Sequence, residues 1–152
     1  MTEERVTKTV MDWLSARCWE ILDYDFPGGG TGRRFRFADA DSTRDKNAGA
    51  FCPDIVAWKD GSIILFENKA IETLSDFGKQ AKIRMDPSIR KQLVSAYPRK
   101  PFGAIFVALA FSGAFKRHED AKSFGIDFVL TVSENGNVRG VYKSERIGNL
   151  LG

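Results

Sequence analysis

The sequence predicts a mixed α/β fold in which helices flank a central β-sheet, and three observations support this. Residues 3–24 carry apolar side chains at the spacing of an amphipathic helix. Two apolar runs rich in Ile and Val flank Asp60-Gly61, a strong signal for a two-residue β-hairpin. Residues 102–110 form a continuous apolar strand, which indicates a sheet covered on both faces. The length of 152 residues fits one domain, residues 1–152, with its own hydrophobic core.

The remaining elements follow from chain breakers and from periodicity. Pro27 and the glycines at 28–30 are expected to end the first helix. Residues 33–37 alternate arginine with phenylalanine, as in a strand with one basic and one apolar face, and the polar residues 38–50 are expected to form a loop. The other predicted elements are helices at 74–85, 87–97 and 118–124, strands at 126–132 and 138–142, and a turn at Asn135-Gly136.

Composition excludes several classes of function. His118 is the single histidine, which removes HNH and His-rich zinc chemistry and leaves a Ser-His-Asp triad only if His118 is its base. Cys18 and Cys52 lack metal-ligand spacing and are interpreted as reduced thiols of a cytoplasmic protein. The N-terminus lacks a secretory signal, and the longest apolar stretch, 102–115, is too short to cross a bilayer. No membrane association is therefore expected.

The predicted hairpin brings three ionisable side chains together. If Asp60 and Gly61 form the turn, the ladder places Asp54 opposite Glu67 on the same face of the sheet. Lys69 lies two residues further along and shares that face, whereas Asn68 points the other way. Opposed carboxylates repel each other unless a cation lies between them, and Mg²⁺ prefers oxygen ligands. The alternative is a solvent-exposed salt-bridge cluster at the edge of a sheet.

These residues resemble the signature of the PD-(D/E)XK nuclease superfamily. Pro53-Asp54 is followed after twelve residues by Glu67-Asn68-Lys69. The resemblance implies a restriction-endonuclease-like fold, with a central mixed β-sheet flanked by helices and an αβββαβ core. It also implies that Asp54 and Glu67 bind Mg²⁺, with Mn²⁺ able to substitute, and that Lys69 lies near the attacking water.

Further site residues are implied by the same resemblance. Many members carry a glutamate in the first helix that completes the metal site, and Glu20 is the best placed for this role, although an exposed helix glutamate is the alternative. Glu3 and Glu4 are poorer choices because they lie at the end of the predicted helix, where it is expected to fray. Related nucleases also place a glutamine in the helix after the hairpin, here Gln80, to contact the site or the DNA backbone. Asp76 and Glu72 are interpreted as solvated helix charges.

Basic residues are concentrated in one segment. Residues 79–100 contain seven basic side chains and one acid, a net charge of +6 in a chain whose net charge is +3. Basic helices beside a metal site are typical of proteins that bind backbone phosphates, and a solvated face is the alternative. The residues expected to contact DNA are Arg33, Arg34, Arg36, Lys79, Gln80, Lys82, Arg84, Arg90 and Lys91.

The sequence therefore predicts a Mg²⁺-dependent endonuclease that hydrolyses DNA phosphodiester bonds. A homodimer is expected, because one small domain carries one site and cutting a duplex requires two. A restriction or defence nuclease, a toxin nuclease and a Holliday-junction resolvase share this chemistry, so duplex and branched DNA are both possible substrates. The alternative from another class is a non-catalytic DNA-binding module of the same fold, which an intact Asp54, Glu67 and Lys69 argue against.

Overall fold

The computed structural model describes residues 1–26, 29–30 and 52–151. The predicted strand at 33–37 and loop at 38–50 lie outside the described residues, and so do Arg33, Arg34 and Arg36.

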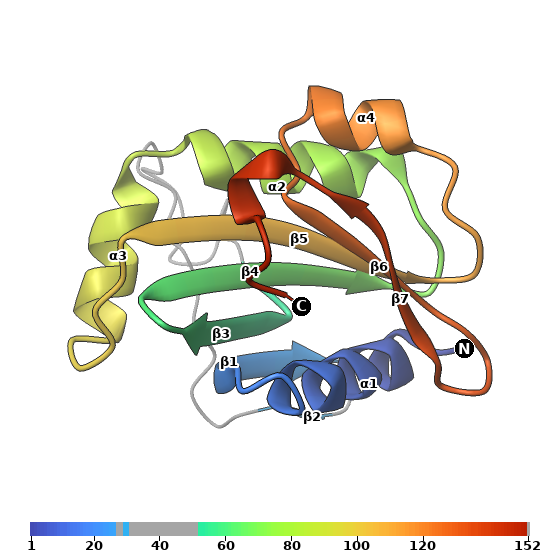
Figure 1. Cartoon of the computed structure of the whole chain (residues 1–152), viewed down its shortest axis with the longest axis horizontal. Helices are drawn as coiled ribbons and strands as arrows, with labels where there is room; N and C mark the ends of the chain where they lie inside the picture. The colour runs from blue at the N-terminus through green and yellow to red at the C-terminus, as the bar shows by residue number, and fades with distance from the viewer. Residues whose placement is uncertain (27–28, 31–51, 152) are drawn as a thin grey trace, which may run out of the picture.

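A single mixed sheet forms the centre of the molecule, in the order β2-β1-β3-β4-β5-β6-β7 (Figure 1). Strands β1, β3 and β4 are antiparallel neighbours, β4-β5 and β5-β6 are parallel, and β7 returns antiparallel to β6. The strands are β1 (Glu20–Phe26), β2 (Gly29–Gly30), β3 (Ile55–Lys59), β4 (Ser62–Lys69), β5 (Ala104–Ser112), β6 (Phe128–Val132) and β7 (Val138–Lys143).

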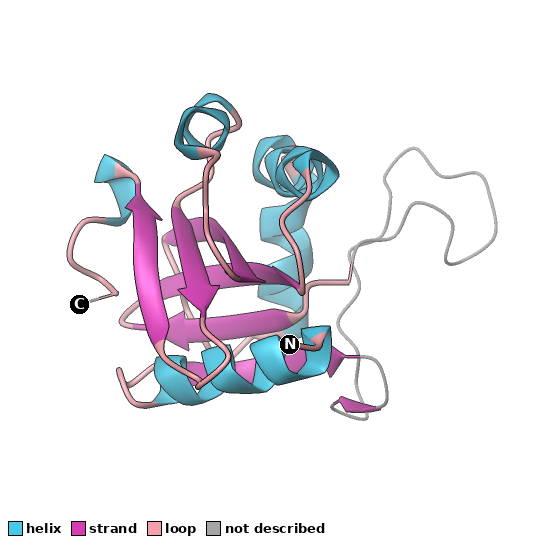
Figure 2. Cartoon of the chain, turned by 90° about the vertical axis from the view of Figure 1, so that its right-hand side faces the viewer, coloured by secondary structure: helices cyan, strands magenta, loops and turns pink. Residues whose placement is uncertain are grey.

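Helices cover both faces of this sheet (Figure 2). On one face, α1 (Glu3–Ser15) packs Val6, Val10 and Leu14 against apolar side chains of the sheet. The other face is covered by α2 (Leu74–Met85), α3 (Ser88–Ala96) and α4 (His118–Ser123). A short 3-10 turn, η1 (Glu145–Ile147), follows β7. Apart from the two-residue β2 and the additional helix α3, the chain follows the order α1-β1-β3-β4-α2-β5, which confirms the predicted αβββαβ core of a restriction-endonuclease-like fold.

The hairpin that carries the predicted site has the expected register. Lys59 pairs with Ser62 and the ladder continues regularly to Ile55 opposite Phe66. Asp60 and Gly61 both have positive φ, 48° and 78°, as a type I′ turn requires. The strand β4 is buried on both faces from Ser62 to Phe66, because helices cover each side. The turn residues Asp60 and Gly61 therefore predict the register of this hairpin correctly.

The predicted first helix, by contrast, is too long. It ends at Ser15, and the chain reverses at Cys18, whose φ is 65°, before entering β1 at Glu20. The segment after the reversal pairs with β3, for example Tyr24 with Ile55. This pairing satisfies backbone groups along an edge of β3 that a helix would leave open. The apolar pattern of residues 19–24 fits a helix as well as a strand, and this tertiary pairing decides between them.

Among the described helices, none combines the length and the apolar character needed to cross a membrane.

Candidate functional site

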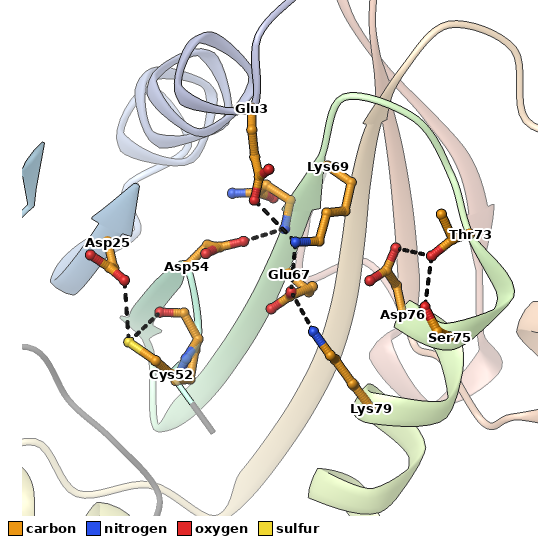
Figure 3. Close-up of polar contacts among 12 residues, drawn as sticks. Glu3, Asp25, Cys52, Asp54, Glu67, Lys69, Thr73, Ser75, Asp76 and Lys79 are labelled. Atoms are coloured by element: carbon orange, nitrogen blue, oxygen red, sulfur yellow. Dashed lines mark hydrogen bonds and ion pairs between the residues drawn. The ribbon is translucent and has the colours of Figure 1, made fainter. Parts of the chain in front are cut away.

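Asp54, Glu67 and Lys69 lie together at the end of the β3–β4 hairpin that is remote from its turn (Figure 3). Asp54 immediately precedes β3, and its N–H donates to the carbonyl of Phe66 over 2.9 Å. Its Oδ2 accepts a hydrogen bond of 2.6 Å from the backbone N–H of Asn68. The backbone of β4 therefore fixes the Asp54 carboxylate beside Glu67 and Lys69. Asn68 itself points to the opposite face, as predicted, and its amide donates to Thr7 of α1.

Glu67 lies between two ammonium groups (Figure 3). Its Oε1 is 3.5 Å from Nζ of Lys69 and 3.7 Å from Nζ of Lys79 in α2. The Glu67 side chain is only 14% exposed, so this is not the solvent-exposed salt-bridge cluster that the sequence left open. A carboxylate that is largely buried requires cationic partners, because desolvation disfavours its charge.

The two carboxyl groups bind protons unusually tightly in the absence of a metal. Burial, followed by the nearby charge of Glu67, raises the pKa of Asp54 to about 8, against the opposing effect of the Asn68 hydrogen bond. Burial also raises the pKa of Glu67, although Lys69 and Lys79 oppose the change. Two desolvated carboxylates that raise each other's energy are well suited to share a hard divalent cation.

Lys69 is held as a cation. Its Nζ is 3.1 Å from Oε1 of Glu3, at the start of α1, in addition to its contact with Glu67. Burial lowers the pKa of Lys69, but its hydrogen bond to Glu3 and the charges of Glu67, Glu3 and Asp54 outweigh this effect and raise the pKa above its usual value. A lysine in this state donates hydrogen bonds and offsets negative charge, and is a poor proton acceptor.

The donor set fits Mg²⁺ better than a transition metal. Within the described ranges, no three His, Cys, Asp or Glu side chains gather in a group that could by itself enclose a metal ion. Mg²⁺ does not require such a cage, because it usually keeps several waters and binds through one or two carboxylates plus substrate phosphate. Asp54 and Glu67 supply those two carboxylates, and burial leaves both in need of a counter-charge.

Glu20 does not complete this site, which corrects the prediction. It lies in β1 opposite Trp58 and pairs with Lys100. Because Trp58 is four residues from Asp54 along β3, Glu20 is displaced from the site by roughly 13 Å at about 3.3 Å per residue. The first-helix glutamate beside the site is Glu3 instead. The helix start does not fray there, because the side chain of Thr2 caps it by accepting the N–H of Arg5.

Asp76 is a second residue that the sequence did not place at the site. It is 2% exposed rather than solvated, and accepts a 2.6 Å hydrogen bond from the hydroxyl of Thr73 (Figure 3). Its negative charge contributes to the raised pKa of Glu67. The T-x-x-D spacing at the start of α2 is typical of a capped helix start, but no local signal reveals that this start lies beside Glu67.

Gln80 is a structural residue, which corrects its predicted contact with the site or with DNA. It is 2% exposed, and its Nε2 donates to the carbonyls of Leu65 over 3.0 Å and of Ala108 over 2.6 Å. The side chain thus ties α2 to β4 and β5 from the inside of the molecule. Because both N–H donors are engaged and the side chain is buried, Gln80 has no donor left for the phosphate oxygens of a nucleic acid.

Gln80→Ala is expected to lower the free energy of unfolding by about 2–3 kcal/mol, because it leaves two buried carbonyls without these donors and opens a cavity. Lys82→Ala, at an exposed position of the same helix, is the matched control and is expected to stay within about 0.5 kcal/mol of wild type. Urea denaturation measures both. Equal stabilities for the two variants would contradict the assignment.

The predicted DNA-contacting residues of the basic segment separate in space. Lys79 lies at the site, and Lys82 and Lys91 are exposed on α2 and α3. Arg84 and Arg90 are directed elsewhere: Arg84 contacts Gly125 and Asp127, and Arg90 donates to the carbonyl of Gly103 over 2.8 Å. The segment therefore does not form one continuous surface around the carboxylates.

No protein-family model matches the chain, and no curated protein matches it. Among solved structures, the chain is similar to an XisH family protein from Nostoc punctiforme PCC 73102. The two share 15% sequence identity with a TM-score of 0.42, and the match covers 91% of this chain and 99% of that chain.

Proposed function

We propose that this protein is a metal-dependent nuclease that hydrolyses DNA phosphodiester bonds. One observation carries the proposal: two largely buried carboxylates, Asp54 and Glu67, lie at the end of one hairpin beside a lysine that is held positively charged. A fold gains no stability from burying two acids together, so this arrangement indicates a function that uses them.

Asp54 and Glu67 would hold the metal, Mg²⁺ or Mn²⁺. When bound, such an ion lowers the pKa of a water molecule and offsets the negative charge of the phosphate. The backbone N–H of Asn68 orients the Asp54 carboxylate, and Lys79 helps to keep Glu67 charged. These contacts fix both acids before any ligand arrives, so little reorganisation is needed during the reaction.

Lys69 would act on the attacking water and on the phosphate. Its Nζ lies 3.1 Å from Oε1 of Glu3 and 3.5 Å from Oε1 of Glu67, and these two contacts fix its position at the edge of the site. As a cation it orients the water through a hydrogen bond and offsets the charge that develops on the phosphate oxygens. Its raised pKa favours this role over that of a general base.

Purified wild type is expected to nick supercoiled plasmid DNA when Mg²⁺ or Mn²⁺ is added and to be inactive in EDTA. Lys69→Ala is expected to reduce the rate at least about a hundredfold, as for the loss of a group that stabilises transition-state charge. Gel electrophoresis of plasmid forms measures both. A wild type that binds DNA and cuts it with neither metal would favour the non-catalytic DNA-binding module.

Two further properties belong to the proposal. A duplex cut requires two sites, so we propose that the protein acts on DNA as a homodimer. In the plasmid assay, a homodimer is expected to produce linear DNA at the same time as nicked DNA. A restriction-type nuclease and a junction resolvase are separated by their substrates, since a resolvase cuts a four-way junction much faster than a linear duplex of the same sequence. Single-stranded RNA in the same assay tests the choice of DNA.

A further inference from the structure

A polar pocket lies away from the carboxylates, where the end of α2 and the start of α3 meet the beginning of β5 and η1. Its volume is about 550 Å³ and three arginines line it, Arg84, Arg90 and Arg146. Arg84 and Arg90 belong to the basic segment 79–100, whereas Arg146 lies in η1, so no local sequence pattern groups all three. Figure 1 shows the end of α2 and the start of α3 at the same end of the sheet as the beginning of β5.

Each arginine is fixed by contacts that leave part of its guanidinium group for the pocket. Arg146 donates from Nε and Nη2 to Asp127 over 3.1 Å and 2.9 Å, and also to the carbonyl of Ile105. Arg84 donates to the carbonyl of Gly125 and lies 3.7 Å from Asp127. A guanidinium carries five N–H donors, and a group already held in place loses little entropy when it binds a ligand.

Arg90 is held differently from the other two. Its Nη2 donates to the carbonyl of Gly103 over 2.8 Å, and its guanidinium lies over the ring of Phe102 at 5.4 Å from the centroid. No ion pair with a carboxylate is recorded for Arg90 among the described residues. It is therefore the arginine of the three whose positive charge is least compensated.

The acids of this region are committed to other groups. Asp127 is fully buried and accepts hydrogen bonds from the N–H of Val107 and the hydroxyl of Ser144, besides its contacts with Arg146. Asp86 lines the pocket and accepts the N–H of Ser88 at the start of α3 over 2.8 Å. Three guanidinium groups against these two carboxylates leave a net positive lining.

This pocket is distinct from the proposed nuclease site. Its wall includes Ala104, which pairs with Ser62, whereas Lys69 pairs with Phe111 at the other end of the same two strands. Phe111 lies seven positions after Ala104 along β5, which separates the two places by roughly 23 Å at about 3.3 Å per residue.

We propose that the Arg84–Arg90–Arg146 pocket binds the phosphate group of a phosphorylated ligand. Planar guanidinium groups match phosphate oxygens in geometry and in charge. The volume of about 550 Å³ is within the range of small-molecule sites, so a free nucleotide fits as well as a phosphate of a nucleic-acid strand. The proposal does not depend on cleavage, because the three arginines bind phosphate whether or not Asp54 and Glu67 hold a metal.

The test measures binding in EDTA, where no cleavage occurs. Isothermal titration calorimetry with pyrophosphate, and then with a mononucleotide, is compared with fluorescence anisotropy of a short labelled single-stranded oligonucleotide. Arg90→Gln is the informative variant, because Arg90 is not bound to the buried Asp127 and its loss leaves no charge unpaired inside the molecule. Lys116→Gln removes the same charge from an exposed position outside the pocket and is the matched control.

We expect Arg90→Gln to weaken binding of pyrophosphate at least about tenfold, and Lys116→Gln to change it less than about twofold. Tighter binding of the mononucleotide than of the oligonucleotide identifies a free nucleotide as the ligand, and the reverse order identifies a nucleic-acid strand. The proposal is overturned if wild type binds none of the three probes, or if the two variants weaken binding equally, because general electrostatic attraction would then explain the result. Circular dichroism confirms that both variants are folded.

Discussion

Glu67→Gln is expected to reduce Mg²⁺-dependent DNA cleavage by at least about a hundredfold, because loss of residues that only support metal ligands already costs about 10- to 100-fold. The substitution keeps the shape of the side chain and removes its negative charge, so it weakens metal binding without opening a cavity. Calcium binding, measured by calorimetry, is expected to weaken in parallel. This second measurement does not depend on cleavage.

Glu20→Gln is the matched control for this experiment. Glu20 is the first-helix candidate suggested by the sequence, but it lies in β1, is 49% exposed and pairs with Lys100. We expect the Glu20 variant to cleave DNA and bind calcium within about twofold of wild type, since exposed ion pairs contribute little. If instead Glu20→Gln abolished cleavage while Glu67→Gln retained it, the assignment of the metal ligands would be wrong.

Asp54→Asn is expected to stabilise the metal-free protein at pH 8 by about 2 kcal/mol. Burial raises the pKa of Asp54 from 3.8 to about 8, so the folded protein retains a proton that the unfolded chain has lost. Folding is therefore penalised progressively as the pH rises from about 4 to about 8, and asparagine, which resembles the protonated acid, avoids the penalty. A tenfold change in proton affinity corresponds to about 1.4 kcal/mol. The two pKa values therefore set an upper limit of roughly 6 kcal/mol on the stabilisation by Asp54→Asn.

Urea denaturation in EDTA at pH 4, 6 and 8 measures this effect. The difference between Asp54→Asn and wild type is expected to be near zero at pH 4 and to grow up to pH 8, whereas Asp12→Asn, at an exposed position of α1, is expected to show no such trend. Added calcium is expected to stabilise wild type and not the Asp54 variant, since only the native carboxylate binds the ion. A difference that does not change with pH would contradict the raised pKa.

The proposed catalytic residues could be predicted from the sequence because they lie in one short hairpin. Asp60-Gly61 specifies a two-residue turn, and the turn sets the register that brings Asp54 and Glu67 to the same end of the strands. The boundaries of α2 and α3 were predicted to within one residue for the same reason, since helical periodicity and Pro87 act over a few neighbouring positions.

The identity of the groups around those residues was decided by the tertiary structure. Glu3 rather than Glu20 contacts Lys69, because the chain leaves the first helix at Ser15 to pair with β3. Gln80 turned out to be buried because two carbonyls, from Leu65 and Ala108, meet beneath α2.

The Arg84–Arg90–Arg146 pocket shows the same limit of local sequence patterns. Arg84 and Arg90 lie in one basic segment, but their partner Arg146 is more than fifty residues away along the chain. The sequence by itself determined the fold class, the hairpin and the three proposed catalytic residues, since each depends on contacts between near neighbours. Only the tertiary structure decided which side chains surround them and where the arginines gather, because those contacts join segments that the chain brings together when it folds.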